Sequence, residues 1–107
     1  MEYKEIRQFD DVLMYELQRN KIKTLTFSQM WSVCAAAAPQ IPIFTGSDEV
    51  DHRSFASSLL GNIANLEHRG YVTVYRRREK IQQISLTQRG NDWLQHVTFT
   101  HQDRMGE

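Results

Sequence analysis

The sequence is poor in the residues that mark several protein classes. It has one cysteine among 107 residues, so a single chain can form neither a disulfide framework nor a CxxC metal site. This shortage is typical of a reducing, intracellular setting. Acidic and basic residues balance at thirteen each, which leaves no net charge. Domains devoted to nucleic acid usually carry net positive charge, so any such contact would depend on a local basic patch.

Long hydrophobic runs are also missing. No segment approaches the roughly 18 apolar residues that a membrane span needs, and the first residues, MEYKEIRQFDD, are too charged for a signal peptide. We therefore expect a cytoplasmic protein with no membrane partner. With 40% apolar residues the chain can build one small core, and its length predicts a single domain over residues 1–107.

Groups of residues that carry catalysis are scarce as well. The histidines lack metal-ligand spacing with Cys, Asp or Glu, and no glycine-rich phosphate loop is present. Cys34 lies in the apolar run MWSVCAAAA, where a thiol is expected to stay protonated and to serve as a small core residue. We expect a protein that is not an enzyme and that has no metal and no cofactor.

Hydrophobic periodicity predicts that most of the chain is helical. Apolar residues recur at three- and four-residue steps through residues 3–20 and again through residues 53–69. Between them, Thr26 and Gln29 have the spacing of a capping box and predict a helix over residues 26–38. Because this helix carries almost no charge, we expect it to be buried on most of its surface.

A short β-ribbon is predicted after the third helix. Gly70 suits the left-handed stop of that helix, and residues 71–86 contain two strand-forming runs, YVTVY and IQQISL. The alternation IKTL at residues 22–25 could add a strand that pairs with the ribbon. Thr87 caps a last helix over residues 88–97, and the tail from Phe99 should fray. The fold class is then mainly α with a small β-ribbon.

The polar face of the third helix is small and almost uncharged. A solvated helix usually carries Lys and Glu, whereas a mid-helix glycine such as Gly61 costs about 1 kcal/mol against alanine. A DNA major groove is one explanation, because Asn pairs with adenine and Ser with several base edges. The other is ordinary helix surface, or close packing of Gly61 on another helix. The candidate DNA-binding residues on this helix are Arg53, Ser54, Ser57, Ser58, Asn62 and Asn65.

The ribbon tip, RRREK, is the only dense basic cluster of the sequence. Its cations are Arg76, Arg77, Arg78 and Lys80. Such a tip can rest on phosphates or enter a minor groove, whose negative potential attracts arginine. Alternatively, it is a solvated loop kept polar so that strand edges do not pair. We favour contact with nucleic acid.

Three pieces of the sequence resemble the MarR family of winged-helix regulators and, less closely, the PadR family. LTFSQMWSV, residues 25–33, is similar to the leucine-threonine-x-x-glutamine opening of that family's second helix. LEHRGYV, residues 66–72, is similar to its turn from recognition helix to wing, and ISLTQRG, residues 84–90, to its return into the last helix. The resemblance covers residues 25–94. It implies a winged helix-turn-helix, with residues 53–69 in the major groove, and a homodimer on a palindromic site of double-stranded DNA.

Two functions stay open at this point. In the first, the chain is a small DNA-binding transcriptional regulator, in which the basic tip supplies affinity and the third helix reads bases. In the second, the winged helix is a protein-interaction module, an adaptor or inhibitor of a larger nucleic-acid machine, and does not itself bind DNA. The absence of net charge and the acidic run Asp48, Glu49 and Asp51 favour the second.

Overall fold

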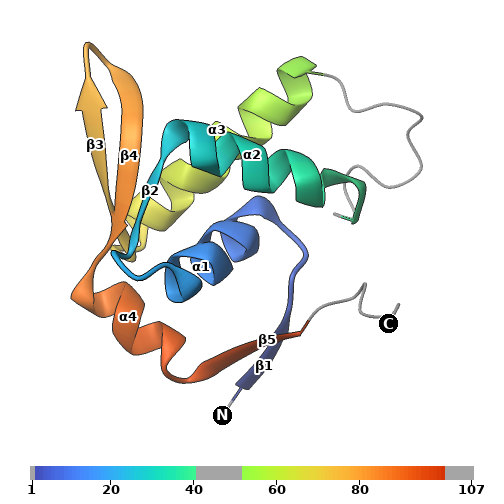
Figure 1. Cartoon of the computed structure of the whole chain (residues 1–107), viewed down its shortest axis with the longest axis vertical. Coiled ribbons are helices and arrows are strands. Elements are labelled where there is room, and N and C mark those ends of the chain that lie inside the picture. The colour runs from blue at the N-terminus through green and yellow to red at the C-terminus, as the bar shows by residue number, and fades with distance from the viewer. Residues whose placement is uncertain (1, 41–51, 101–107) are drawn as a thin grey trace.

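A computed structural model describes residues 2–40 and 52–100, in which helices and strands alternate (Figure 1). The acidic run Asp48, Glu49 and Asp51 lies outside these residues. The elements are β1 (Glu2–Glu5), α1 (Phe9–Arg19), β2 (Thr24–Thr26), α2 (Phe27–Ala37), a 3-10 turn η1 (Ala38–Gln40), α3 (His52–His68), β3 (Val72–Arg77), β4 (Lys80–Leu86), α4 (Gln88–Leu94) and β5 (Val97–Thr100).

The ribbon belongs to a three-stranded antiparallel sheet. Its strands lie in the order β2-β4-β3, and β2 pairs with β4 so that Leu25 stands opposite Ile84. The predicted strand before the second helix is thereby confirmed over Thr24–Thr26. Because side chains alternate along a strand, Leu25 and Ile84 both point into the core, where each is at most 3% exposed.

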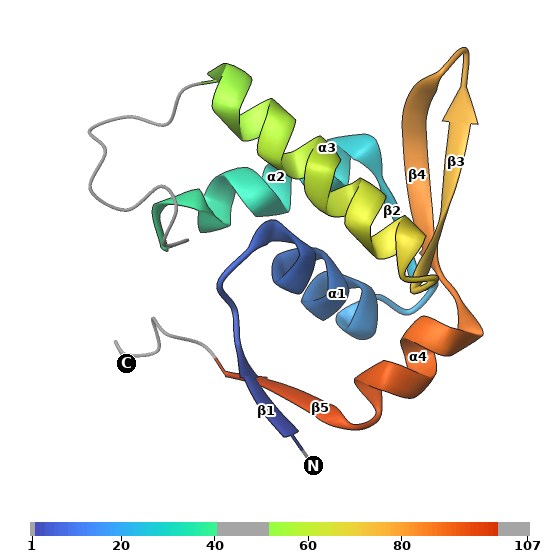
Figure 2. The ribbon, with the colours of Figure 1, turned by 180° about the vertical axis from the view of Figure 1, so that it is seen from behind.

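The core lies where α1, α2 and α3 meet the inner face of this sheet. Seen from behind, α3 crosses in front of α2, and α1 lies below both (Figure 2). Phe55 of α3 joins the helices, because its ring makes edge contacts with Phe9 of α1 at 5.2 Å and with Trp31 of α2 at 4.6 Å between centroids. The fully buried side chains are Phe9, Leu13, Met14, Leu17, Met30, Cys34, Leu59, Ile63, Leu66 and Ile84. Cys34 is therefore the core residue that the sequence predicted.

The fold contains more sheet than the sequence predicted. The expected helix over residues 3–20 begins only at Phe9, and residues 2–5 form β1 instead. The Asp11 carboxylate explains this start, because it accepts hydrogen bonds from the backbone amides of Arg7 and Gln8 and so closes the first turn. The structure is a mixture of helix and sheet, so the expectation of a mainly α fold is corrected.

The C-terminal side of the fold also differs from the expectation. The last helix ends at Leu94 instead of residue 97, and β5 then runs parallel to β1, with Tyr3 opposite Thr98 and Lys4 opposite Phe99. Phe99, expected in a frayed tail, is only 8% exposed. The sequence VTFT has the two-residue apolar alternation of a strand, which the helical reading overlooked.

Helix α2 is far less buried than its low charge suggested. Within α2 only Met30 and Cys34 are buried, and five uncharged side chains are exposed: Ser28, Gln29, Ser32, Ala35 and Ala36. Low charge on a helix therefore indicated small side chains here and not burial on all sides.

Candidate nucleic-acid interface

The tip of the hairpin holds charged residues in a strained turn. Arg77 pairs with Lys80, so Arg78 and Glu79 alone connect the two strands, with φ of 54° and 65°. Two-residue hairpin turns with positive φ at both positions normally use Asn-Gly or Asp-Gly, and other residues in this left-handed region cost roughly 1–2 kcal/mol each. The turn thus keeps charged side chains where less strained residues were available.

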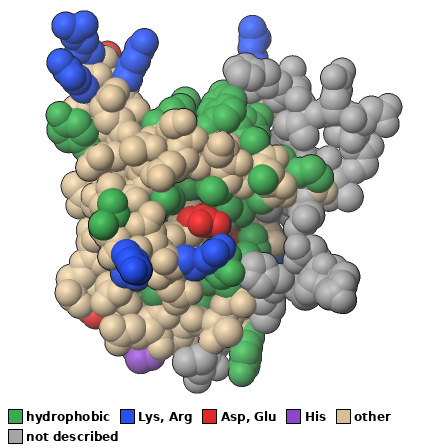
Figure 3. All heavy atoms as spheres, in the orientation of Figure 1, with side chains coloured by type: hydrophobic (Ala, Val, Ile, Leu, Met, Phe, Trp, Pro, Cys, Tyr) green, Lys and Arg blue, Asp and Glu red, His purple; other side chains and the backbone are tan. Residues whose placement is uncertain are grey.

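Three cations of the tip are free to contact a partner. Arg77, Arg78 and Lys80 are exposed, and none of them forms an ion pair with any residue in the described ranges. Figure 3 shows basic side chains gathered at the upper left, over the end of the hairpin, with acidic atoms visible among them. Phosphate oxygens are ligands of the kind that such a cluster attracts.

Arg76 behaves differently from the other tip cations. Strand alternation places it on the same face of β3 as Val72 and Val74, and there it meets α3. Its guanidinium donates two hydrogen bonds to the Glu67 carboxylate, at 3.0 and 2.9 Å. These bonds lower the pKa of Glu67. An exposed pair contributes little stability, but two parallel bonds fix an orientation. Arg76 therefore orients the hairpin against α3, and its expected contact with DNA stays a prediction.

The outer face of α3 is narrow and weakly charged, as the sequence predicted. Arg53, Ser54 and Ser57 are exposed there, and Ser58 is half-buried. The exposed stripe continues through residues that were not among the predicted site: Leu60, Gly61, Ala64 and His68. Their three- and four-residue spacing was the signal that could have found them. Leu60 is 46% exposed because its neighbour Leu59 occupies the inward position.

Gly61 has no packing role within the described chain. A Cβ built on it meets no atom within 4 Å, whereas one built on Gly90 would overlap the carbonyl oxygen of Tyr71. The alternative that Gly61 lets another helix approach closely therefore finds no support among the described residues. The helix is weakened at this position without any gain inside the fold.

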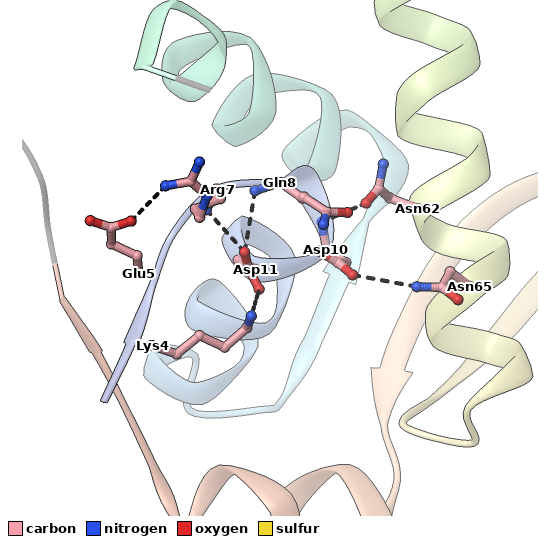
Figure 4. A network of polar contacts seen from close by, with 8 residues as sticks. All are labelled: Lys4, Glu5, Arg7, Gln8, Asp10, Asp11, Asn62 and Asn65. Atoms are coloured by element: carbon pink, nitrogen blue, oxygen red, sulfur yellow. Dashed lines mark hydrogen bonds and ion pairs between the residues drawn. The ribbon is translucent and has the colours of Figure 1, made fainter. Parts of the chain in front are cut away.

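Two predicted site residues, Asn62 and Asn65, face α1 instead of the outer surface (Figure 4). The Asn62 side-chain oxygen accepts a hydrogen bond from the Asp10 amide at 3.1 Å, and its NH₂ donates to the Ser58 carbonyl at 2.6 Å. Asn65 donates to the Asp10 carboxylate at 3.4 Å. Both amides join α3 to the start of α1 and so position the helix, whereas their expected role in reading bases stays a prediction.

Asp10 is an unusual anchor for these amides. It is 7% exposed, and its Oδ1 atom is buried without a hydrogen-bond partner among the described residues. Burial, with the neighbouring charge of Asp11, raises the pKa of Asp10. Asp11, by contrast, is satisfied by two backbone amides and by Lys4 at 3.3 Å.

The described residues offer little for a metal or a cofactor. Among them, no group of three or more His, Cys, Asp or Glu side chains could hold a metal ion. A cavity of about 60 Å³ lies beside Asp10, lined also by Lys4, Arg69 and Trp93, and has room for a few water molecules only. Burial raises the pKa of the Cys34 thiol to about 12, which keeps it protonated.

The hairpin tip and the first turn of α3 project to the same side of the molecule. Both reach the top in Figure 1, well apart from each other across the view, while β1 and β5 lie at the opposite end. Exposed Arg53 in the first turn of α3 therefore shares this side with the tip cations. We call the exposed α3 stripe and residues 77–80 together the upper surface.

Comparison of the chain with protein-family models, curated proteins and solved structures gives no match. Within the described residues, no helix is both long and apolar enough to cross a membrane. The resemblance to MarR regulators stays a prediction, so functional inference rests on the geometry of the upper surface.

Replacement of Gly61 and of Gly90 by alanine should change the free energy of unfolding in opposite directions. Gly61→Ala should raise the free energy of unfolding by about 0.5–1 kcal/mol, because alanine restricts the backbone of the unfolded chain and its Cβ meets no atom in the folded helix. Gly90→Ala should lower it by roughly 1–3 kcal/mol through overlap with Tyr71. Urea unfolding followed by circular dichroism measures both values. A loss of stability in Gly61→Ala would show that something in the fold does occupy that space.

Replacement of Asp10 and of Asp11 by asparagine should change thermal stability at pH 7 in opposite directions. The raised pKa of Asp10 means that the folded state binds its proton more readily than the unfolded state. Protonated Asp10 therefore adds to the free energy of unfolding. This contribution is fully present below the pKa of Asp in the unfolded chain, about 3.9, and is lost as pH rises through the pKa of Asp10 in the folded chain. Asp10→Asn should therefore unfold at a higher temperature than the native chain at pH 7, and the difference should disappear in acid. Asp11→Asn should be destabilised at pH 7, since it loses the Lys4 ion pair and weakens the helix start. Thermal melts of the native chain and both variants at several pH values measure these differences in unfolding temperature. Equal losses in both variants would contradict this view of Asp10.

Proposed function

We propose that this chain is a winged helix-turn-helix domain that binds double-stranded DNA through the upper surface. In this proposal α3 enters the major groove and the hairpin is the wing, with its tip on phosphates or in the adjacent minor groove. A role as a small transcriptional regulator is the simplest use of such a domain.

The order of the elements supports the winged-helix part of the proposal. Three helices surround one core, a short strand β2 lies between the first two, and the hairpin follows the third. The strand β2 then joins the hairpin at β4, so the sheet ties the wing to the helices. A helix followed directly by a basic two-stranded ribbon suits simultaneous contact with a groove and with the neighbouring backbone.

The observation that carries the DNA-binding part is the tip itself. Three exposed cations occupy four consecutive positions, 77–80, and two of these positions carry a backbone that charged residues adopt at a cost. The Arg76–Glu67 bonds hold this charge at a fixed place relative to α3. A tip kept polar only to prevent edge pairing could also carry cations, but it would not need a fixed orientation relative to α3.

Each part of the upper surface then has a role of its own. Arg77, Arg78 and Lys80 supply affinity through phosphates, whichever sequence is bound. Arg53 contacts a phosphate or a base from the first turn of α3, and Ser54 and Ser57 contact base edges. The bare position Gly61 lets the helix lie close to the groove.

A second function, a protein-interaction module, is favoured by one observation. The exposed side of α2 carries only uncharged and mostly small side chains, including Ser32, Ala35 and Ala36. Such a surface contains nothing that neutralises phosphates, yet a protein could cover it with little loss of solvation. In that case the tip cations would contact acidic side chains of the partner.

Salt-dependent binding to random-sequence duplex DNA separates the two functions. The logarithm of the binding constant should fall linearly with the logarithm of salt concentration, with a slope of about −0.9 per phosphate neutralised. Replacing Arg77, Arg78 and Lys80 by glutamine should therefore flatten the slope by roughly 2 to 3. Fluorescence anisotropy of a labelled duplex measures it.

A matched triple variant controls for net charge. Arg19, Lys21 and Arg89 are also exposed but do not belong to the upper surface, so their replacement by glutamine should leave the slope nearly unchanged. If both triple variants flattened the salt dependence equally, the contribution of the tip cations would be explained by overall charge alone. No binding of the native chain at low salt would end the DNA proposal and favour the protein-interaction module.

A further inference from the structure

The outer face of the three-stranded sheet is uncharged and open to solvent. The inner face packs on the core, and strand alternation directs every second side chain to the other face. The register brings six outer side chains into two rows across the strands: Thr26, Gln83 and Tyr75 in one row, and Thr24, Ser85 and Thr73 in the other. Both edge strands are exposed on this face, at Thr26 on β2 and at Thr73 and Tyr75 on β3.

Tyr75 is the one large side chain of this face. It is 56% exposed, and its ring contacts no other aromatic ring within the described residues. Tyr15, by contrast, packs on Phe99 at 5.9 Å between ring centroids. Tyr71 stacks on Trp93 at 5.3 Å. Tyrosine is a good strand former, but strand formation alone does not require an uncovered ring. A flat aromatic surface is therefore available to a planar ligand.

Two cations of the tip adjoin this ring. The register shifts just beyond Tyr75, after which Arg77 pairs with Lys80. Because Arg76 points inward to α3, Arg77 points outward, on the same face as Tyr75. Two residues of strand separate the ring from Arg77, a span of about 6.5 Å. Neither Arg77 nor Lys80 forms an ion pair within the described ranges, so both can bind an anion beside the ring.

An amide lies on the other side of the ring. Gln83 stands directly opposite Tyr75 on β4, where side chains of paired residues are in contact. Its amide can both donate and accept hydrogen bonds. The ring, the amide and the cations together match the parts of a nucleotide, which are the face of a base, its edge and its phosphate.

We infer that the outer face of the sheet binds single-stranded nucleic acid, with an unpaired base stacked on Tyr75 and the adjoining phosphates on Arg77 and Lys80. Gln83 forms hydrogen bonds with the edge of the stacked base. In a double helix the neighbouring base pairs cover both faces of each base, so only an unpaired base can occupy the ring. A protein partner suits this face less well, because the ring lies on a flat polar surface without the apolar pocket that an anchoring side chain fills.

This site goes beyond the proposed function, because it needs neither α3 nor a duplex. The two sites share Arg77 and Lys80, so variants of these cations cannot separate them. The ring of Tyr75 and the unpaired bases belong to the single-strand site alone. An experiment that varies the ring and the bases therefore tests this site by itself.

Fluorescence anisotropy of a labelled oligothymidine strand measures binding to unpaired bases, because thymines do not pair with one another in a stable duplex. Tyr75→Val keeps a strand-forming residue but removes the ring. It should weaken binding roughly five- to hundredfold, the usual effect of losing one stack between a base and an aromatic ring. Tyr75→Phe keeps the ring and should bind like the native chain. Circular dichroism melts check that both variants fold.

Tyr3→Val is the matched control. Tyr3 is 73% exposed but lies on β1, in the separate sheet that β1 forms with β5. Loss of this tyrosine should leave the affinity for oligothymidine unchanged. Equal weakening by Tyr3→Val and Tyr75→Val would overturn the inference, as would a native chain that does not bind oligothymidine at low salt.

A strand of the same length without bases separates stacking from charge. It carries the same phosphates, so the native chain should bind it more weakly than oligothymidine, by at least the factor that Tyr75→Val costs. Tyr75→Val should distinguish the two strands far less than the native chain does. A native chain that binds both strands equally would contradict stacking on the ring.

A mixed-sequence duplex tells the two proposals apart. Tyr75→Val should bind the duplex like the native chain, because paired bases present no open face to the ring. If the native chain binds oligothymidine but no duplex, the proposed function fails and the single-strand site stands. Binding to the duplex alone would overturn only the single-strand site. Equal weakening of both by Tyr75→Val would overturn it as well, since the ring would then not select unpaired bases.

Discussion

Burial of one stripe of α3 is the constraint on which the other features depend. Phe55, Leu59, Ile63 and Leu66 are at most 5% exposed, and together they fix which side of the helix faces solvent. Their full burial contributes about 1.5–3 kcal/mol each, far more than any polar contact of the surface. The Asn62 and Asn65 bonds to Asp10 add orientation to this packing, because they set the rotation of α3 against α1. The slim outer stripe is a consequence of this arrangement.

The hairpin depends on α3 in turn. Gly70, with φ of 81°, ends the helix, and its carbonyl accepts a hydrogen bond from the Thr87 hydroxyl at 2.6 Å, which ties both ends of the ribbon together. Farther out, Arg76 fixes the strand to Glu67. The free cations beyond it are thus carried on a ribbon with two attachments to the helix. The upper surface can act as one unit because these attachments leave the tip little freedom relative to α3.

The sequence predicted what local patterns determine. The capping box at Thr26, the stop at Gly70 and the cap at Thr87 are all present, because each depends on residues a few positions apart. The strand β5 was missed although VTFT alternates like a strand, and β1 was missed because its partner strand lies far along the chain. Within the site, Arg76, Asn62 and Asn65 were predicted as DNA-binding residues without any partner inside the fold. Their partners, Glu67 and Asp10, are assigned only when the elements are packed together, which composition and periodicity cannot show.

The central claim is that the exposed α3 stripe and the tip form one surface for nucleic acid. Amide chemical shifts, recorded by NMR while a mixed-sequence duplex is added at low salt, test it most directly. We expect shifts at residues 53–61 and 77–80 together, with β1, β5 and the exposed side of α2 unchanged. Absence of any shift, or shifts confined to α2, would contradict it and would place the functional surface elsewhere on the molecule.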